Sequence, residues 1–125
     1  MARHYHVDIA AYVADADRKW VDNLLSHFDV PGVDAAKQGV ARRISASGVH
    51  HIALIRRLVV DLAVSIDRAV ALAHALLTTD ATHVALSEVL ALHLDRDRFR
   101  RETDRRLSDA VESIVPARRG RPPTR

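Results

Sequence analysis

Residues 48–77, GVHHIALIRRLVVDLAVSIDRAVALAHALL, carry the most regular apolar pattern in the chain. Within this stretch, residues 49–62 and 66–77 each repeat apolar side chains every three or four positions, which is the spacing of one helix face. Ser47 and Ser65 precede the two segments, and a serine there can accept a hydrogen bond from a free amide of the first turn. The stretch therefore predicts two amphipathic helices joined by a short corner.

Two further helices are expected before this pair. Residues 7–13 and 18–28 place their apolar side chains at helical spacing, and Asp15 or Asp17 between them is suited to cap the second helix. Residues 30–40 contain one proline and two glycines, which indicates a loop or a small hairpin. The predicted order is thus a short helix, a tight turn, a second helix and a glycine-containing loop.

The segment after the quoted stretch changes its pattern twice. Residues 82–94 alternate apolar and polar side chains, which indicates a two-stranded hairpin, with a continuing helix as the alternative. Residues 96–114 return to helical spacing, and Pro116 ends this last helix. We divide the single-domain chain into three parts: residues 1–79, residues 80–115 and the tail 116–125.

The second part, 80–115, is too short for a large effector-binding domain, and we expect it to form a dimer interface or to dock a partner. A dimer is attractive because twofold symmetry doubles the contacts that a small domain can make. The side chains expected to be buried there or against the core are Leu90, Leu92, Leu94, Phe99, Leu107, Val111 and Ile114.

Composition and charge narrow the function classes. The chain has 125 residues, of which 48% are hydrophobic, and this is enough for one modest core. Four of the 19 basic side chains lie in residues 116–125, which contain no acid, so residues 1–115 carry 15 basic against 16 acidic side chains. The net charge of +3 therefore resides in the tail.

The absence of cysteine excludes disulfides and thiolate chemistry, and it fits a reducing compartment. We expect neither a signal peptide nor a membrane span, because every apolar stretch is too short. Catalytic motifs are missing, and the histidines lack metal-ligand spacing, so no enzyme activity, metal or cofactor is expected. These features favour a cytoplasmic protein.

The order of these segments resembles the DNA-binding domain of MerR-type transcriptional regulators, which is a winged helix-turn-helix. Residues 6–25, HVDIAAYVADADRKWVDNLL, stand where that family has its helix-turn-helix, and residues 37–45, KQGVARRIS, stand where it has its wing. The quoted stretch matches the helix pair that follows the wing, although the family's corner glycine is Ala63 here and the wing aromatic is absent. The distant resemblance covers about residues 7–77.

Together with the pattern of the last third, the resemblance implies a mainly α fold: a winged helix-turn-helix, a short C-terminal β-hairpin and a terminal helix. It implies a recognition helix at about residues 17–28 and a wing at about residues 31–44. Asparagine suits adenine, and arginine or lysine suits guanine and phosphate. The implied DNA-binding residues are Arg18, Lys19, Asn23 and Ser26 on the helix and Lys37, Gln38, Arg42 and Arg43 on the wing.

Three further charged residues are interpreted separately from this set. Asp22 would repel phosphate, so we expect it to orient an arginine instead. Arg56 and Arg57 would add phosphate contacts if their helix passed the DNA strand, and a solvated helix face is the alternative.

The tail PARRGRPPTR resembles the core of an AT-hook through Arg118, Arg119, Gly120 and Arg121. A narrow A·T minor groove attracts arginine, and glycine lets the backbone lie on its floor. We therefore expect a sequence-specific transcriptional regulator that binds double-stranded DNA as a homodimer and is associated with the nucleoid. The alternatives are an antitoxin-like DNA-binding protein whose C-terminal half neutralises a toxin partner, and a protein-interaction module that does not bind DNA.

Overall fold

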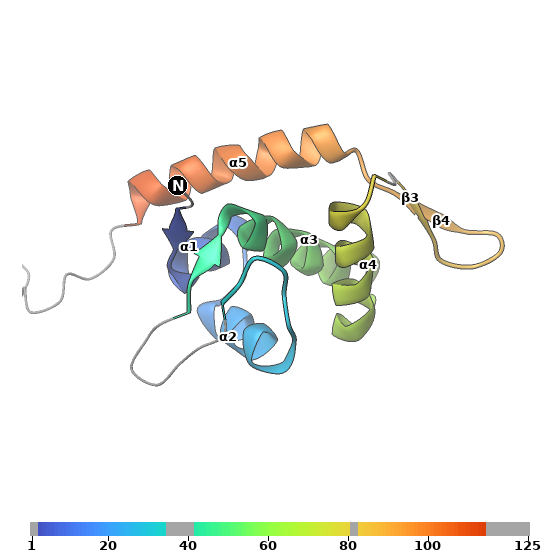
Figure 1. Cartoon of the computed structure of the whole chain (residues 1–125), viewed down its shortest axis with the longest axis horizontal. Helices are drawn as coiled ribbons and strands as arrows, with labels where there is room; N and C mark the ends of the chain where they lie inside the picture. The colour runs from blue at the N-terminus through green and yellow to red at the C-terminus, as the bar shows by residue number, and fades with distance from the viewer. Residues whose placement is uncertain (1–2, 35–41, 81–82, 115–125) are drawn as a thin grey trace, which may run out of the picture.

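The computed structural model describes residues 3–34, 42–80 and 83–114, and helices account for most of these residues (Figure 1). The mainly α class predicted from the sequence is confirmed. The helices of the described residues are α1 (Val7–Ala14), α2 (Arg18–His27), α3 (Ala46–Leu62), α4 (Ile66–Thr78) and α5 (Arg96–Ser113).

A small sheet lies beside the N-terminal end of α3. Strand β1 (His4–Tyr5) pairs antiparallel with β2 (Ile44–Ser45), so that Tyr5 faces Ile44. Val33 forms an antiparallel bridge to the same Ile44, which therefore lies between two neighbouring segments and is fully buried. The pairing brings three segments side by side that are far apart in the sequence, at residues 4–5, 33 and 44–45.

A second sheet is the predicted hairpin between α4 and α5. Strand β3 (His83–Ala85) pairs antiparallel with β4 (Ala91–His93), with Val84 opposite Leu92. The hairpin interpretation of this segment is confirmed, and the continuing helix is wrong. The hairpin projects from the helical body, to the right in Figure 1.

Helices α1 and α2 are joined by a turn of three residues. Helix α1 is almost entirely apolar because it contacts α2, α3 and α5, whereas α2 buries only Val21 and Leu24. Asp15 ends α1 in the left-handed conformation (φ 56°), which reverses the chain. Asp17 stands at the N-cap of α2, but its side chain makes no capping hydrogen bond, contrary to the capping role expected for it.

Helix α3 begins at Ala46, three residues earlier than predicted, because its cap is Ser45 and not Ser47. The Ser45 hydroxyl accepts a hydrogen bond from the Gly48 amide at 3.2 Å and donates to the Gly32 carbonyl at 3.0 Å. One side chain thus caps the helix and ties it to the loop that follows α2. Helical periodicity could not predict this cap, because the contact between Ser45 and the loop depends on the tertiary structure.

The corner between α3 and α4 follows the prediction. Ser65 caps α4 by accepting a hydrogen bond from the Arg68 amide at 3.3 Å. Ala63 ends α3 in the left-handed conformation, with φ 55°. This is the position at which glycine would cost no steric strain.

Helix α5 packs across α1 and α3 and belongs to the same hydrophobic core, to which it contributes Leu107 and Ala110 (Figure 1). Arg106 donates hydrogen bonds to the carbonyl oxygens of Tyr12 and Val13 at 2.6 and 3.0 Å. A cation is favourable at these carbonyls because they form the negative end of the α1 dipole. None of the helices in the described ranges has both the length and the apolarity needed to cross a membrane.

The apolar side chains expected to be buried in the C-terminal part differ in their exposure. Leu107 is buried, whereas Leu90 is 62% exposed and is not packed against the core of its own chain, so for Leu90 only burial in an interface stays a prediction. The remaining five are half-buried and pack against the core: Leu92, Leu94, Phe99, Val111 and Ile114.

Candidate nucleic-acid interface

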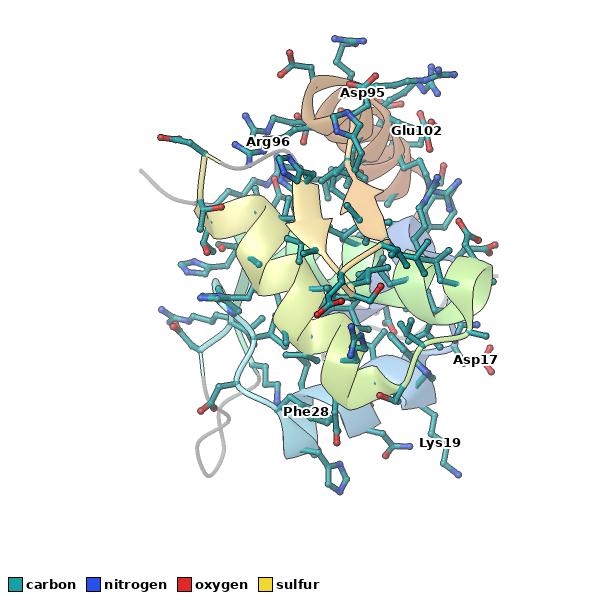
Figure 2. All side chains as sticks on the ribbon, turned by 90° about the vertical axis from the view of Figure 1, so that its right-hand side faces the viewer. Asp17, Lys19, Phe28, Asp95, Arg96 and Glu102 are labelled. Atoms are coloured by element: carbon teal, nitrogen blue, oxygen red, sulfur yellow. The ribbon has the colours of Figure 1, made fainter. Side chains whose placement is uncertain are left out.

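Helix α2 presents one polar face to solvent. Its apolar side chains point inward because Val21 and Leu24 occupy one stripe of the helix, one turn apart. The opposite face carries the predicted residues Arg18, Lys19, Asn23 and Ser26, all of which are exposed. Figure 2 shows Lys19 extending away from the body, at the opposite end of the molecule from Asp95 and Glu102.

A network of charges organises this face. The Asp22 carboxylate lies 3.7 Å from the Arg18 guanidinium on the same helix and 3.9 Å from the Arg42 guanidinium. Arg42 also donates a hydrogen bond to the Ser26 hydroxyl at 3.2 Å. Asp22 therefore has the place expected for a carboxylate that orients arginines, with one arginine on each side.

Asp8 is a member of this network that the sequence did not indicate. Its carboxylate lies 3.4 Å from Arg18 and 3.3 Å from His6. Asp8 belongs to the first turn of α1, so it connects the two helices on either side of the tight turn. No sequence pattern predicts the contact, because it depends on the angle at which α2 leaves α1.

The predicted wing is only partly within the described residues. Lys37 and Gln38 lie outside them, as do the tail residues Arg118, Arg119, Gly120 and Arg121. The flanks of the loop are paired, since the Asp34 amide donates to the Arg43 carbonyl at 2.9 Å and the Ser45 amide to the Gly32 carbonyl at 2.9 Å. Arg42 and Arg43 therefore stand at the base of a closed loop next to α2, and Arg43 is exposed.

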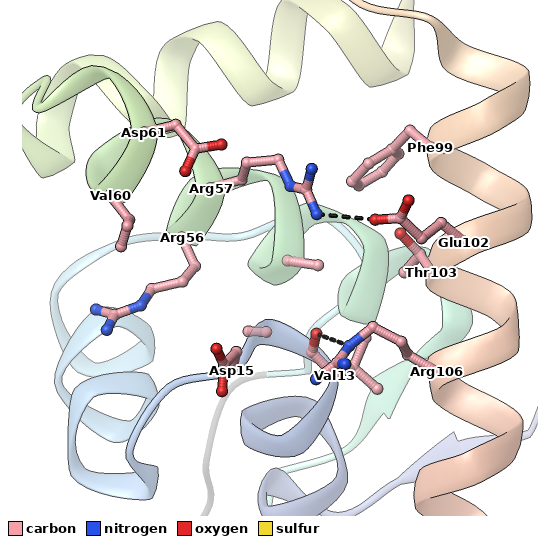
Figure 3. Close-up of a pocket in the computed structure, with 12 residues that line it drawn as sticks. Val13, Asp15, Arg56, Arg57, Val60, Asp61, Phe99, Glu102, Thr103 and Arg106 are labelled. Carbon is pink, nitrogen blue, oxygen red and sulfur yellow. Dashed lines mark hydrogen bonds and ion pairs between the residues drawn. The ribbon is translucent and has the colours of Figure 1, made fainter.

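Two other candidate arginines, Arg56 and Arg57, already make contacts with side chains of the same chain. The Arg56 guanidinium lies over the Trp20 ring, 4.9 Å from its centroid, and Arg57 donates to the Glu102 carboxylate at 2.9 Å. Both line a cleft of about 390 Å³ between α1, α3 and α5 (Figure 3). The expected phosphate contact is therefore not favoured for Arg57, because α5 already neutralises its charge.

The charges of this cleft balance one another. Its lining includes three arginines and three acids, and Figure 3 shows Arg57 directed to Glu102 and Arg106 directed to the main chain at Val13. A cleft lined by equal numbers of opposite charges lacks the excess potential that attracts a charged ligand. The acids and arginines that line it are Asp15, Asp61, Glu102, Arg56, Arg57 and Arg106.

The histidines do not form a metal centre. Within the described ranges, no group of three or more His, Asp or Glu side chains is arranged to hold a metal ion. His50 instead pairs with Asp104 of α5 at 2.7 Å. Burial lowers the pKa of His51 below its ordinary value, and the nearby His74 and His50 act in the same direction, while a hydrogen bond with the Ser47 carbonyl opposes them.

Comparison of the chain with protein-family models, with curated proteins and with solved structures found no match.

Proposed function

We propose that the protein is a sequence-specific DNA-binding regulator that places α2 in the major groove. The observation that carries this proposal is the exposed polar face of α2. This face follows a three-residue turn after α1 and is flanked by two arginines at the base of the next loop. The major groove admits one α-helix, and a helix-turn-helix inserts the second helix of such a pair.

The side chains on this face have separable roles in the proposal. Asn23 and Lys19 are exposed beyond the ion-pair network and are the candidates for base contacts. Asn pairs with adenine through two hydrogen bonds, and Lys donates to guanine or to phosphate. Arg43, at the base of the next loop, is the candidate for a phosphate-backbone contact beside the groove, which would position the helix without reading sequence.

Asp22 acts in this proposal by holding guanidinium groups in place. Arg18 and Arg42 lie on either side of its carboxylate, so their donors are directed before DNA arrives. Preorganised side chains lose less conformational entropy when they bind. The carboxylate also repels phosphate. On a DNA sequence that offers the arginines no base contact, this repulsion is not offset, so binding to that sequence is weaker.

The C-terminal tail extends the proposed interface to the minor groove. The Arg-Gly-Arg-Pro sequence at residues 119–122 matches what a narrow A·T-rich groove accepts. A tether to a domain already bound raises the local concentration of the tail at its site. We further propose that two copies bind together, since twofold symmetry doubles the contacts on a palindromic operator.

The test is a fluorescence-anisotropy titration of the full-length chain and of a chain ending at residue 115. The probes are an A·T-rich duplex, a G·C-rich duplex and the DNA upstream of the gene, each at several salt concentrations. Phosphate contacts give a linear fall of log K with log salt, and loss of the tail makes this slope shallower. The truncation should remove the A·T preference and keep the preference for the upstream DNA. Absence of binding to every duplex at low salt would refute the proposal.

A further inference from the structure

The β3–β4 hairpin has an apolar tip that nothing in the described part of the chain covers. Val89 is 86% exposed and Leu90 is 62% exposed. Both lie in the turn, which projects away from the helices (Figure 1). An isolated two-stranded hairpin is marginally stable in water, and exposed apolar side chains at its tip add to the cost of this arrangement.

Neither edge of the hairpin pairs with a further strand within the described residues, because the sheet contains only β3 and β4. Helix α4 contacts β3, so β4 carries the edge that is available to a further strand. The Leu86 amide donates to the Leu90 carbonyl, and pairs along an antiparallel ladder alternate between bonded and non-bonded. The backbone groups of Ala91 and His93 therefore point outward. Neither lysine, proline nor a bulge protects this edge, although exposed edge strands usually carry such a device.

An apolar hollow lies at the foot of the same hairpin. Its volume is about 170 Å³, and Leu62 at its rim is 45% exposed. The leucines that line it come from α3, α4 and the β4 end of the hairpin: Leu54, Leu58, Leu62, Leu76, Leu92 and Leu94. The molecule thus carries both an apolar protrusion and an apolar hollow, separated by the length of one short strand.

We propose that two copies of this chain form a dimer by antiparallel pairing of their β4 strands. A twofold axis at Leu92 places Ala91 opposite His93 of the second copy, and these are the residues whose backbone groups point outward. The same register places Leu90 opposite Leu94 of the second copy, at the foot of its hairpin. Each tip then covers the partner's hollow, and the two hairpins form one four-stranded sheet.

A second copy fits this surface better than an unrelated partner because the two halves are complementary to each other. In an antiparallel pair of identical hairpins, the tip of each lies beside the foot of the other, and the hollow is located at the foot. The apolar tip, the β4 edge and the hollow then all lie within one symmetric interface. The proposal concerns the protein without DNA, so its failure would leave the DNA-binding proposal standing.

Sedimentation velocity of the full-length chain without DNA tests the interface. We expect a dimer for the wild-type chain and an association weaker by about ten-fold or more for the double variant Val89→Ser/Leu90→Ser, since two apolar side chains return to water. The matched control is Val60→Ser, because Val60 is also exposed (59%) but lies outside the hollow. A monomer at high micromolar concentration, or a dimer that the double variant leaves intact, overturns the proposal.

Cysteine cross-linking tests the register, since the chain contains no cysteine of its own. Residues opposite each other across antiparallel strands have Cβ atoms about 5 Å apart, close enough for a disulfide after small adjustment. Leu92→Cys should therefore form an intermolecular disulfide under mild oxidation, and Leu90→Cys should not. Cross-linking of Leu90→Cys in preference to Leu92→Cys would mean that the hairpins meet tip to tip, and the proposed register would be wrong.

Discussion

At the residue scale, two glycines decide how the loop after α2 meets α3. Gly32 has φ +86°, and a Cβ added to it would lie 2.4 Å from the Gly48 amide nitrogen. A Cβ on Gly48 would lie 2.7 Å from the Gly32 carbonyl oxygen and 3.0 Å from Ile44. The backbones therefore touch, and the contact holds the base of the predicted wing beside the N-terminus of α3.

We predict that Gly48→Ala destabilises the protein by about 1–3 kcal/mol through this clash with backbone. Helix propensity alone would give the opposite sign, because alanine in a helix is favoured over glycine by roughly 0.5–1 kcal/mol. Urea unfolding followed by circular dichroism measures the change. Ala63→Gly is the companion variant: removing the Cβ at a left-handed corner should stabilise the protein by less than about 1 kcal/mol. An increase in stability for Gly48→Ala would contradict the close contact.

His51 should make stability depend on pH. Burial lowers the pKa of His51 in the folded state, whereas the pKa in the unfolded chain is the ordinary histidine value of 6.5. As pH falls below this value, the unfolded chain binds a proton that the folded protein excludes, so stability is lost. The loss cannot exceed about 1.4 kcal/mol per pH unit for one group.

The measurement compares urea unfolding at pH 7 and pH 5 for the wild type and for His51→Leu. We expect the variant to lose less stability over this interval, because its buried side chain no longer titrates. His83→Leu provides the control, since His83 is exposed. Equal pH dependence for His51→Leu and the wild type would show that His51 is protonated equally in the folded and unfolded states.

At the element scale, α2 has a mixed rather than a uniformly basic face. Asp22 lies among Arg18, Lys19 and Arg42, and the ion pairs are exposed enough for salt to screen them. Such a face is suited to specific contacts more than to strong non-specific attraction. In the proposed DNA complex, the sequence-independent part of the affinity for DNA is assigned to Arg43 and to the tail.

We predict that the double variant Lys19→Ala/Asn23→Ala loses affinity for upstream DNA by about 1–3 kcal/mol and reads its sequence less selectively. The control is Arg101→Ala, which removes the same single charge from an exposed residue of α5. Helix α5 lies on the other side of the molecule from α2 (Figure 1). Anisotropy titrations of both variants against upstream and scrambled duplexes separate local contacts from net charge. Equal losses for the two variants would exclude α2 as the reading element.

At the scale of the whole molecule, α5 is part of the folded core. Leu107 and Ala110 pack with α1 and α3, and Arg106 binds the carbonyl end of α1. Glu102 and Asp104 turn toward α3, where they pair with Arg57 and His50. The last helix therefore supports the same α1 that positions α2.

A chain ending at residue 95 should accordingly lose its cooperative thermal transition, because α1 would expose the apolar side that α5 covers. The matched control ends at residue 115, which keeps α5 and should keep the melting temperature of the full-length chain. Differential scanning calorimetry of both chains is the measurement. If the chain ending at residue 95 melts like the full-length protein, α5 does not stabilise the core and is better described as a separate docking segment.

Much of the element order followed from local pattern. Helices α1 to α5 and the hairpin were all predictable, because the period of apolar residues reflects which side of each element is buried. The cap of α3 was misplaced at Ser47, since the choice of Ser45 depends on its bond to the distant Gly32. The sequence left open whether Leu90 packs against the core or in an interface, because alternation identifies a hairpin without indicating whether the helical body lies beneath its tip.

The sequence by itself determined a mainly helical chain, the position of each helix and a polar face on the second of them. Only the tertiary structure decided which charges form ion pairs. Arg42 pairs with Asp22 of α2, Asp8 pairs with Arg18, and Glu102 pairs with Arg57. The physical reason is the distance along the sequence over which each kind of interaction acts. Periodicity is set by neighbours within one or two turns, whereas a contact between distant residues depends on how the core orients whole elements.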